Sequence, residues 1–284
     1  MRKDVVIFID QLAPKNKLQI EAIQQFGYAP YCFVNNIKPG SEKYIQSPGK
    51  QIVLQTGFMS RTRQVFAFLK KNRHSIHHVE LYPGGRFSFM YVVLSRLFGL
   101  KTLCVERGDL LYYHKKGYDA LTRFSMYCCY RFSNMVWYRE LYMKARLEKI
   151  RKEGLYFLHN AINCDGHFYD NNHPKDIDFL WLNRVIPERK YKWFLKILGE
   201  EPFRNSHNYL VGIMPTNAYS ADQEYVLQNK PANLTVEQYT SNPVEYFKRA
   251  RFFVLPADVV FANNALLEAM SYGVVPLVSK RPGA

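Results

Sequence analysis

The sequence predicts two successive α/β units, each with a parallel sheet and helices on its faces. Short apolar runs alternate with amphipathic helical stretches, and strand-helix-strand order implies parallel strands. The run between Asn160 and Lys175 interrupts this alternation with Asn, Asp, His and Gly, which is typical of a linker. We therefore expect Rossmann-like domains over residues 1–170 and 171–284, with a ligand in the cleft between them at the carboxyl ends of the strands.

In the N-terminal half, short continuous apolar runs indicate strands that are buried on both faces. The clearest is the run of residues 5–9, with the sequence VVIFI. Further strands are expected over residues 31–34, 51–55, 78–81, 101–105 and 156–158. Helical spacing of apolar residues, as at Val65, Phe66 and Leu69, predicts helices. These helices are expected over residues 15–26, 63–72, 87–98 and about 118–152.

The C-terminal half repeats the same alternation. Its strands are expected over residues 178–182, 209–213, 233–236, 252–255 and 274–278. Its helices are expected over residues 191–198, 217–228, 243–249 and 264–271. The last of these helices stops just before Gly273, a residue type that commonly follows a helix C-terminus.

Composition limits the classes of protein that the chain can belong to. Of its 284 residues, 48% are hydrophobic and 22% charged, which excludes collagen-like and wholly disordered chains. The net charge of +15 favours an anionic partner. Five scattered cysteines and the lack of an apolar run of about 20 residues predict a cytoplasmic protein that contacts membranes only peripherally. No nucleic-acid-binding motif is present, so nucleic acid is not the expected partner.

The last forty residues, EYFKRARFFVLPADVVFANNALLEAMSYGVVPLVSKRPGA, carry the most specific motif. The segment resembles the nucleotide-sugar domain of retaining GT-B glycosyltransferases of the group 1, or family 4, type. It matches the pattern of that family at Pro256, at residues 267–270 (LEAM), at Gly273 and at Pro276. The resemblance implies that Glu268 accepts hydrogen bonds from both hydroxyls of the donor ribose.

A second segment, FLWLNRVIPERKYKWFLKIL, resembles the G-R-L-x-P-E-K-G motif of the same family. The alignment places Arg184 on the family's arginine, Arg189 on its lysine and Lys190 on its glycine. Guanidinium groups between a strand and a helix can neutralise a diphosphate and stabilise the leaving nucleotide. Arg184 and Arg189 are thus expected beside Glu268 as catalytic groups, although Lys190 could replace Arg189 and a solvated basic turn is the alternative.

Residues in the N-terminal half match the family more loosely. The segment LFGLKTLCVERGDL resembles a strand and loop that face the bound sugar, which would put Glu106, Arg107 and Asp109 at the cleft. The segment YFLHNAINCD resembles the strand and turn that close the first domain. The resemblance adds three residues to the expected donor contacts: Arg107, Asn263 and Asn264.

The sequence also departs from the family's pattern. The family has paired glutamates eight positions apart, and Val260 stands where the first would be. Residues 261–263 are FAN instead of G-F-G, and the chain stops at Ala284, where the family continues through further helices. We therefore expect an incomplete second domain, and keep a non-catalytic nucleotide-binding or glycan-binding protein as the alternative function.

Residues 111–153 combine ten Lys and Arg with four acids and many aromatic residues. Such a basic aromatic helix is typical of segments that lie on anionic membranes. The alternative is a core helix with a solvated basic face. The membrane interpretation predicts a peripheral protein at the inner face of the cell membrane.

The resemblance implies transfer of a hexosyl group from a nucleotide sugar to a glycan or lipid-linked acceptor, with retention at the anomeric carbon. The expected setting is the assembly of capsule, lipopolysaccharide or exopolysaccharide. No metal or other cofactor is expected, because arginines can offset the charge of the diphosphate.

Overall fold

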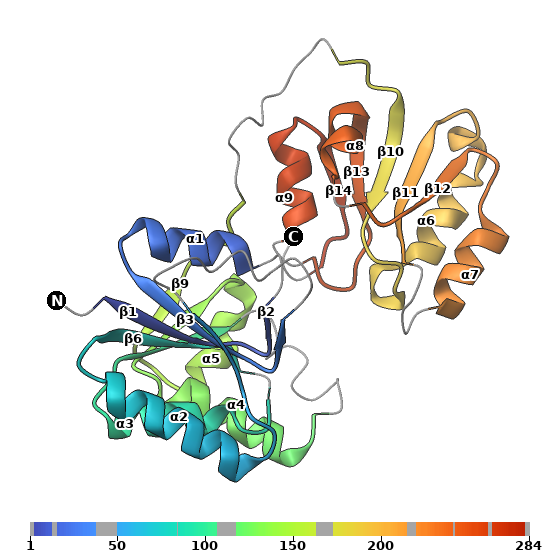
Figure 1. The fold of residues 1–284 in the computed structure, drawn as a ribbon. Coiled ribbons are helices and arrows are strands. Elements are labelled where there is room, and N and C mark those ends of the chain that lie inside the picture. The colour runs from blue at the N-terminus through green and yellow to red at the C-terminus, as the bar shows by residue number, and fades with distance from the viewer. Residues whose placement is uncertain are drawn as a thin grey trace. The chain divides into compact units, whose positions relative to one another are not determined.

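The structure is a computed structural model that describes residues 3–12, 16–37, 50–83, 85–106, 118–162, 173–214, 220–240, 242–260 and 263–281. The chain divides into two compact units, Met1–His159 and Asn160–Ala284 (Figure 1). The boundary predicted at residue 170 lies outside the described residues.

The N-terminal unit is built on a seven-stranded parallel sheet with the order β5-β3-β1-β6-β7-β8-β9. In chain order its strands are β1 (Asp4–Phe8), β3 (Ala29–Val34), β5 (Lys50–Val53), β6 (Ile76–Leu81), β7 (Thr102–Glu106), β8 (Met135–Tyr138) and β9 (Leu155–Phe157). Its helices are α1 (Lys17–Gln25), α2 (Phe58–Asn72), α3 (Ser88–Leu97), α4 (Ala120–Phe132) and α5 (Lys144–Glu148). A separate pair of short strands, β2 (Gln11–Leu12) and β4 (Asn36–Ile37), was not predicted.

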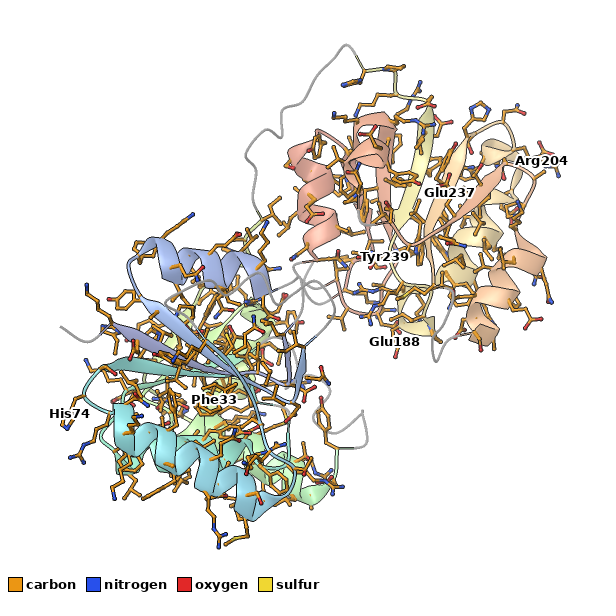
Figure 2. The ribbon with its side chains drawn as sticks, viewed as in Figure 1. Phe33, His74, Glu188, Arg204, Glu237 and Tyr239 are labelled. Carbon is orange, nitrogen blue, oxygen red and sulfur yellow. The ribbon has the colours of Figure 1, made fainter. Side chains whose placement is uncertain are left out.

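Side chains of β1 point alternately to the two faces of this sheet and enter two different cores. Val6 and Phe8 pack with residues of α2, α3 and α4, whereas Val5 and Ile7 pack with Ile20 of α1. Phe33 of β3 lies in the first of these cores (Figure 2). Helices therefore cover both faces, with α1 on one side and α2, α3 and α4 on the other (Figure 1).

The C-terminal unit has a five-stranded parallel sheet with the order β12-β11-β10-β13-β14. Its strands are β10 (Ile177–Leu182), β11 (Asn208–Ile213), β12 (Leu234–Gln238), β13 (Ala250–Leu255) and β14 (Val275–Val278). Its helices are α6 (Tyr191–Leu198), α7 (Ser220–Asn229), α8 (Val244–Arg249) and α9 (Asn264–Ser271). Helices α6 and α7 pack on one face of this sheet, and α8 and α9 pack on the other.

The long helix predicted over residues 118–152 is wrong. The chain there forms α4, then strand β8, then a short 3₁₀ turn (Leu141–Met143) and α5. Asn134 explains the break, because its side-chain oxygen accepts hydrogen bonds from the backbone N–H and the hydroxyl of Thr102, at 2.9 and 3.0 Å. The hydroxyl of Ser133 donates to the carbonyl of Cys129 at 2.6 Å and ends α4 there. The basic aromatic segment is therefore not one interfacial helix.

No helix in the described part of the chain combines the length and the apolar run that a membrane crossing requires.

Candidate functional site

The two motif segments of the C-terminal unit lie at the same edge of its sheet. Strands β10 and β13 are parallel neighbours, so their carboxyl ends are adjacent. Arg184, Arg189 and Lys190 follow β10, whereas Asn263, Asn264 and Glu268 belong to the segment that follows β13. In Figure 2, Glu188 is at this edge and Arg204 is near the opposite one, just before β11.

The turn after β10 is held against β11 by a close backbone approach. The N–H of Asn183 donates to the carbonyl of Val211 at 3.2 Å. A Cβ atom added to Gly212 would lie 1.8 Å from the carbonyl oxygen of Asn183. Only glycine therefore permits this packing. The next side chain, Arg184, is exposed and makes no hydrogen bond or ion pair within the described ranges.

Lys190 begins α6 with a left-handed backbone, at φ 57° and ψ 37°. It is the one residue other than glycine with a positive φ among those that the structure describes. Its carbonyl accepts from the N–H groups of Trp193 and Phe194, at 3.0 and 3.3 Å, and so starts the helix. The family pattern has glycine at this position, and the backbone of Lys190 adopts the conformation that glycine favours.

Asp258 connects the two segments. Its side-chain oxygen lies 3.1 Å from the ammonium nitrogen of Lys190, and its N–H donates to the carbonyl of Glu188 at 3.0 Å. Both side chains of the ion pair are half-exposed, so the pair contributes less than about 1 kcal/mol. Its structural effect is to tie the β13–α9 segment to the turn that precedes α6.

Asn183 and Asn263 form a second connection between these segments. The side-chain oxygen of Asn263 accepts from the N–H of Leu266 at 3.3 Å and caps α9. Its side-chain nitrogen donates to the side-chain oxygen of Asn183 at 3.4 Å. The side-chain nitrogen of Asn183 is buried and has no hydrogen-bond partner in the described structure. Asn264 is exposed and accepts a hydrogen bond from the side chain of Asn160.

Glu268 lies on α9, the helix that this cap begins. Its side chain is partly buried, and burial raises the pKa of its carboxyl group above the ordinary value. The carboxylate accepts no hydrogen bond and forms no ion pair with any residue that the structure describes. A partly desolvated carboxylate without a protein partner is available to bind a ligand with hydroxyl groups.

Val260 is 1% exposed and lies in the hydrophobic core with Phe253 and Leu266. The position at which the family has its first glutamate is therefore a core position in this chain. The neighbouring residues 261 and 262 lie outside the described residues.

The residues singled out in the N-terminal unit are only partly described. Glu106 ends β7 and is fully buried. Arg107, which was expected to contact the donor, and Asp109 lie outside the described ranges. Their predicted roles therefore stay predictions.

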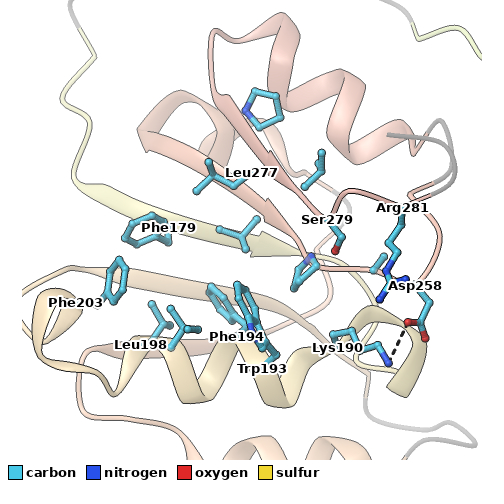
Figure 3. Close-up of a pocket in the computed structure, with 16 residues that line it drawn as sticks. Phe179, Lys190, Trp193, Phe194, Leu198, Phe203, Asp258, Leu277, Ser279 and Arg281 are labelled. Atoms are coloured by element: carbon cyan, nitrogen blue, oxygen red, sulfur yellow. Dashed lines mark ion pairs between the residues drawn. The ribbon is translucent and has the colours of Figure 1, made fainter.

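A cavity of about 760 Å³ lies beside α6, over β13 and β14 (Figure 3). Its walls are mostly apolar and include Trp193, Phe194 and Leu277, and the Lys190–Asp258 ion pair borders it. Neither the two arginines of the motif nor Glu268 lines this cavity, and α9 packs on the opposite face of the sheet. The cationic residues that line the cavity are Lys190, which is paired with Asp258, and Arg281. The residues that match the family's donor site thus lie outside this cavity, and we do not assign the diphosphate to it.

Within the described ranges, no group of three or more His, Cys, Asp and Glu side chains is placed to hold a metal ion.

Neither a protein-family model nor a curated protein matches this sequence. Solved structures do match. Anabaena HepE in complex with UDP and glucose superposes with a TM-score of 0.77 and 11% identity, over 99% of this chain and 82% of its own. The chain has the GT-B fold. A glycosyltransferase from Rickettsia africae ESF-5 has a TM-score of 0.75 and 10% identity, over 100% of this chain and 80% of its own.

Two further matches cover a similar part of the chain. WaaG, a glycosyltransferase involved in lipopolysaccharide biosynthesis, has a TM-score of 0.69 and 14% identity, over 98% of this chain and 82% of its own. A UDP-N-acetylglucosamine 2-epimerase structure matches with a lower TM-score of 0.58. At these identities the comparisons establish the fold.

Proposed function

We propose that this protein transfers a glycosyl group from a nucleotide sugar to a glycan or lipid-linked acceptor. The observation that carries the proposal is the partly buried carboxylate of Glu268, which has no partner among the described residues, at the edge where Arg184 is exposed. The chain that carries it has the GT-B fold. HepE, which has the same fold, was crystallised with UDP and glucose. WaaG, named for lipopolysaccharide biosynthesis, supports surface polysaccharide assembly as the setting.

In this proposal the C-terminal unit binds the donor. The Glu268 carboxylate accepts hydrogen bonds from the ribose hydroxyls, and Arg184 and Arg189 contact the diphosphate. Lys190 is the alternative to Arg189, and its ammonium group would have to leave Asp258 to contact the diphosphate. Asn263, Asn264 and Arg107 are additional donor contacts, and the N-terminal unit binds the acceptor.

The reaction breaks the bond between the anomeric carbon and the diphosphate oxygen, whose electron pair leaves with the nucleotide diphosphate. The acceptor hydroxyl oxygen forms the new bond to the anomeric carbon, and its proton passes to the leaving diphosphate. Arginines held at the diphosphate stabilise the charge that develops there. We propose a hexosyl donor, retention of configuration and no metal, with the reaction at the cytoplasmic face of the cell membrane.

The alternative is a protein that binds a nucleotide sugar or glycan without turnover. The burial of Val260 favours it, because the first glutamate of the family's pair has no counterpart at that position. Turnover distinguishes the transferase from a nucleotide-sugar binder, since both require donor binding, whereas a glycan binder requires no donor.

A thermal-shift screen against UDP-, GDP-, ADP- and dTDP-sugars tests donor binding, because a ligand that binds only the folded state raises its melting temperature. Arg184→Ala and Glu268→Ala should remove the shift that the wild type shows. Arg204→Ala and Glu224→Ala are matched controls, because both residues are exposed and lie away from the motif segments. Release of free nucleotide diphosphate on addition of acceptor would establish transfer. A stabilising nucleotide sugar without turnover would favour the alternative. No shift with any donor would contradict the transferase and the nucleotide-sugar binder, and would leave only the glycan binder.

A further inference from the structure

Helices α2, α3 and α4 form one outer face of the N-terminal unit (Figure 1). Hydrogen bonds and ring contacts join the three helices side by side. Phe66 of α2 contacts Phe98 at the end of α3, with ring centroids 5.1 Å apart. Arg96 of α3 donates to the carbonyl of Phe132 of α4 at 3.0 Å. We call this surface the three-helix face.

Large apolar side chains are exposed along the whole three-helix face. The most exposed are Leu97 (67%), Met59 (62%), Val93 and Phe124 (both 55%) and Phe132 (50%). Further aromatic rings lie between these side chains. The ring centroid of Phe89 is 6.3 Å from that of Phe58 and 6.1 Å from that of Phe124. The apolar surface is therefore continuous from α2 across α3 to α4, and a continuous exposed patch of this kind is characteristic of a binding surface.

The charged residues within these three helices are all of one sign. The sequences of α2, α3 and α4 contain seven basic residues and no acidic residue. The basic residues are Arg61, Arg63, Lys70, Lys71, Arg96, Arg123 and Arg131. The nearest acid in the sequence, Asp119, caps α4 and is paired with Arg86 at 2.7 Å. By contrast α1, on the other side of the sheet, contains Glu21, which forms an ion pair with Lys17.

We propose that the three-helix face docks on an anionic lipid surface. Exposed rings and aliphatic side chains enter the region beneath the headgroups, while Lys and Arg around them contact the headgroup phosphates. An anionic lipid surface is negatively charged throughout. It therefore complements three helices that contain seven basic residues and no acidic residue. This surface deepens the membrane location given under the proposed function, and it does not depend on the transfer reaction itself. It also differs from the segment 111–153 singled out in the sequence, of which only α4 belongs to the face.

Vesicle flotation of the intact chain tests the proposal. Wild-type protein should float with vesicles that contain about one third phosphatidylglycerol and not with pure phosphatidylcholine, and added salt should weaken binding. Leu97→Gln with Phe124→Gln should lower the bound fraction at least fivefold, and so should Lys70→Gln with Lys71→Gln. These side chains are exposed, so the variants should keep the wild-type melting temperature.

Matched controls replace exposed apolar or Lys side chains by Gln away from the face. Leu18→Gln with Leu227→Gln, and Lys196→Gln with Lys230→Gln, should bind vesicles within twofold of wild type. The proposal would be overturned if the wild type did not float, or if it floated equally with both lipids. It would also be overturned if the control variants lost as much of the vesicle-bound fraction as the face variants. Binding of free polyglutamate without flotation would also overturn it and assign the face to an acidic protein. Donor-induced thermal shifts, measured on the same variants, report on the proposed transferase site separately.

Discussion

The ammonium group of Lys190 lies 3.1 Å from the carboxylate of Asp258, and Lys190 reaches it from a left-handed backbone. This arrangement connects the turn after β10 to the segment after β13. A non-glycine residue in that conformation destabilises the folded state by roughly 1 kcal/mol or more. A half-exposed ion pair stabilises it by less than about 1 kcal/mol. Lys190 is therefore not the residue that stability alone would select.

Substituting Lys190 tests this backbone cost directly. Lys190→Gly and Lys190→Ala both remove the ion pair, so their difference reports the backbone alone. We expect the glycine variant to be more stable by about 1 kcal/mol in urea unfolding. The same pair of substitutions at the exposed Lys196, further inside α6, should give the opposite order, because glycine weakens a helix interior by roughly 0.5–1 kcal/mol. Equal stability of the two variants at position 190 would contradict the interpretation.

Gly212→Ala should disrupt the turn that carries Arg184. The added Cβ would lie 1.8 Å from the carbonyl oxygen of Asn183, so β11 or the turn must shift. We expect a loss of about 3 kcal/mol or more in the free energy of unfolding. Gly85→Ala is the control, because its Cβ would meet the Ser88 hydroxyl oxygen at an ordinary 3.5 Å. Circular dichroism during thermal unfolding measures the stability of both variants. If Gly212→Ala were no less stable than Gly85→Ala, Gly212 would not lie so close to the carbonyl oxygen of Asn183.

Glu268→Gln should weaken donor binding and stabilise the free protein. Burial raises the pKa of Glu268, so the folded state holds this proton to a higher pH than the unfolded chain does. The stability that this proton provides is present below the ordinary pKa of glutamate and is lost as pH rises through the raised value. At neutral pH the ionised, partly buried carboxylate therefore destabilises the folded state. Glutamine removes this charge, so Glu268→Gln should be more stable than wild type at neutral pH, and the difference should vanish in acid.

Donor affinity should show the opposite trend. The loss of a charge-assisted contact to the ribose lowers affinity roughly tenfold to a hundredfold. In the wild type, affinity should fall as the pH is lowered and Glu268 becomes protonated, whereas the glutamine variant should lack this dependence. Calorimetric titrations of both proteins across the acid range measure it. A variant that binds the donor as tightly as wild type would exclude Glu268 from the donor site.

Helices with strong local signals were predicted well from the sequence. The bounds of α6 and α9 agree with the prediction at both ends. For α9 the signals are local, because Asn263 caps the helix before an apolar run and Gly273 follows its last turn. The alternating strands and helices also predicted both parallel sheets, since burial on two faces requires continuous apolar runs.

The features that the sequence did not reveal depend on contacts between distant residues. Strand β8 lies where helical periodicity continues. The hydrogen bonds that Thr102, 32 residues away, donates to the side-chain oxygen of Asn134 help to fix this strand in the sheet. The pairing of Asn183 with Asn263 joins residues 80 positions apart, so no local pattern could indicate it. The backbone of Lys190 did have a signal, namely the family's glycine at that position.

Val260→Glu tests the most specific departure from the family's pattern. If Val260 only replaced a ligand-binding glutamate, restoring that residue should improve donor binding. The structure instead places Val260 in the core, at 1% exposure. An unpaired carboxylate there should destabilise the fold by about 3 kcal/mol or more, whereas Val260→Ala should cost roughly 1–3 kcal/mol through the cavity alone. Unfolding in urea compares the two variants. If the glutamate variant were as stable as the alanine variant and bound the donor more tightly, position 260 would face the ligand and the core assignment would be wrong.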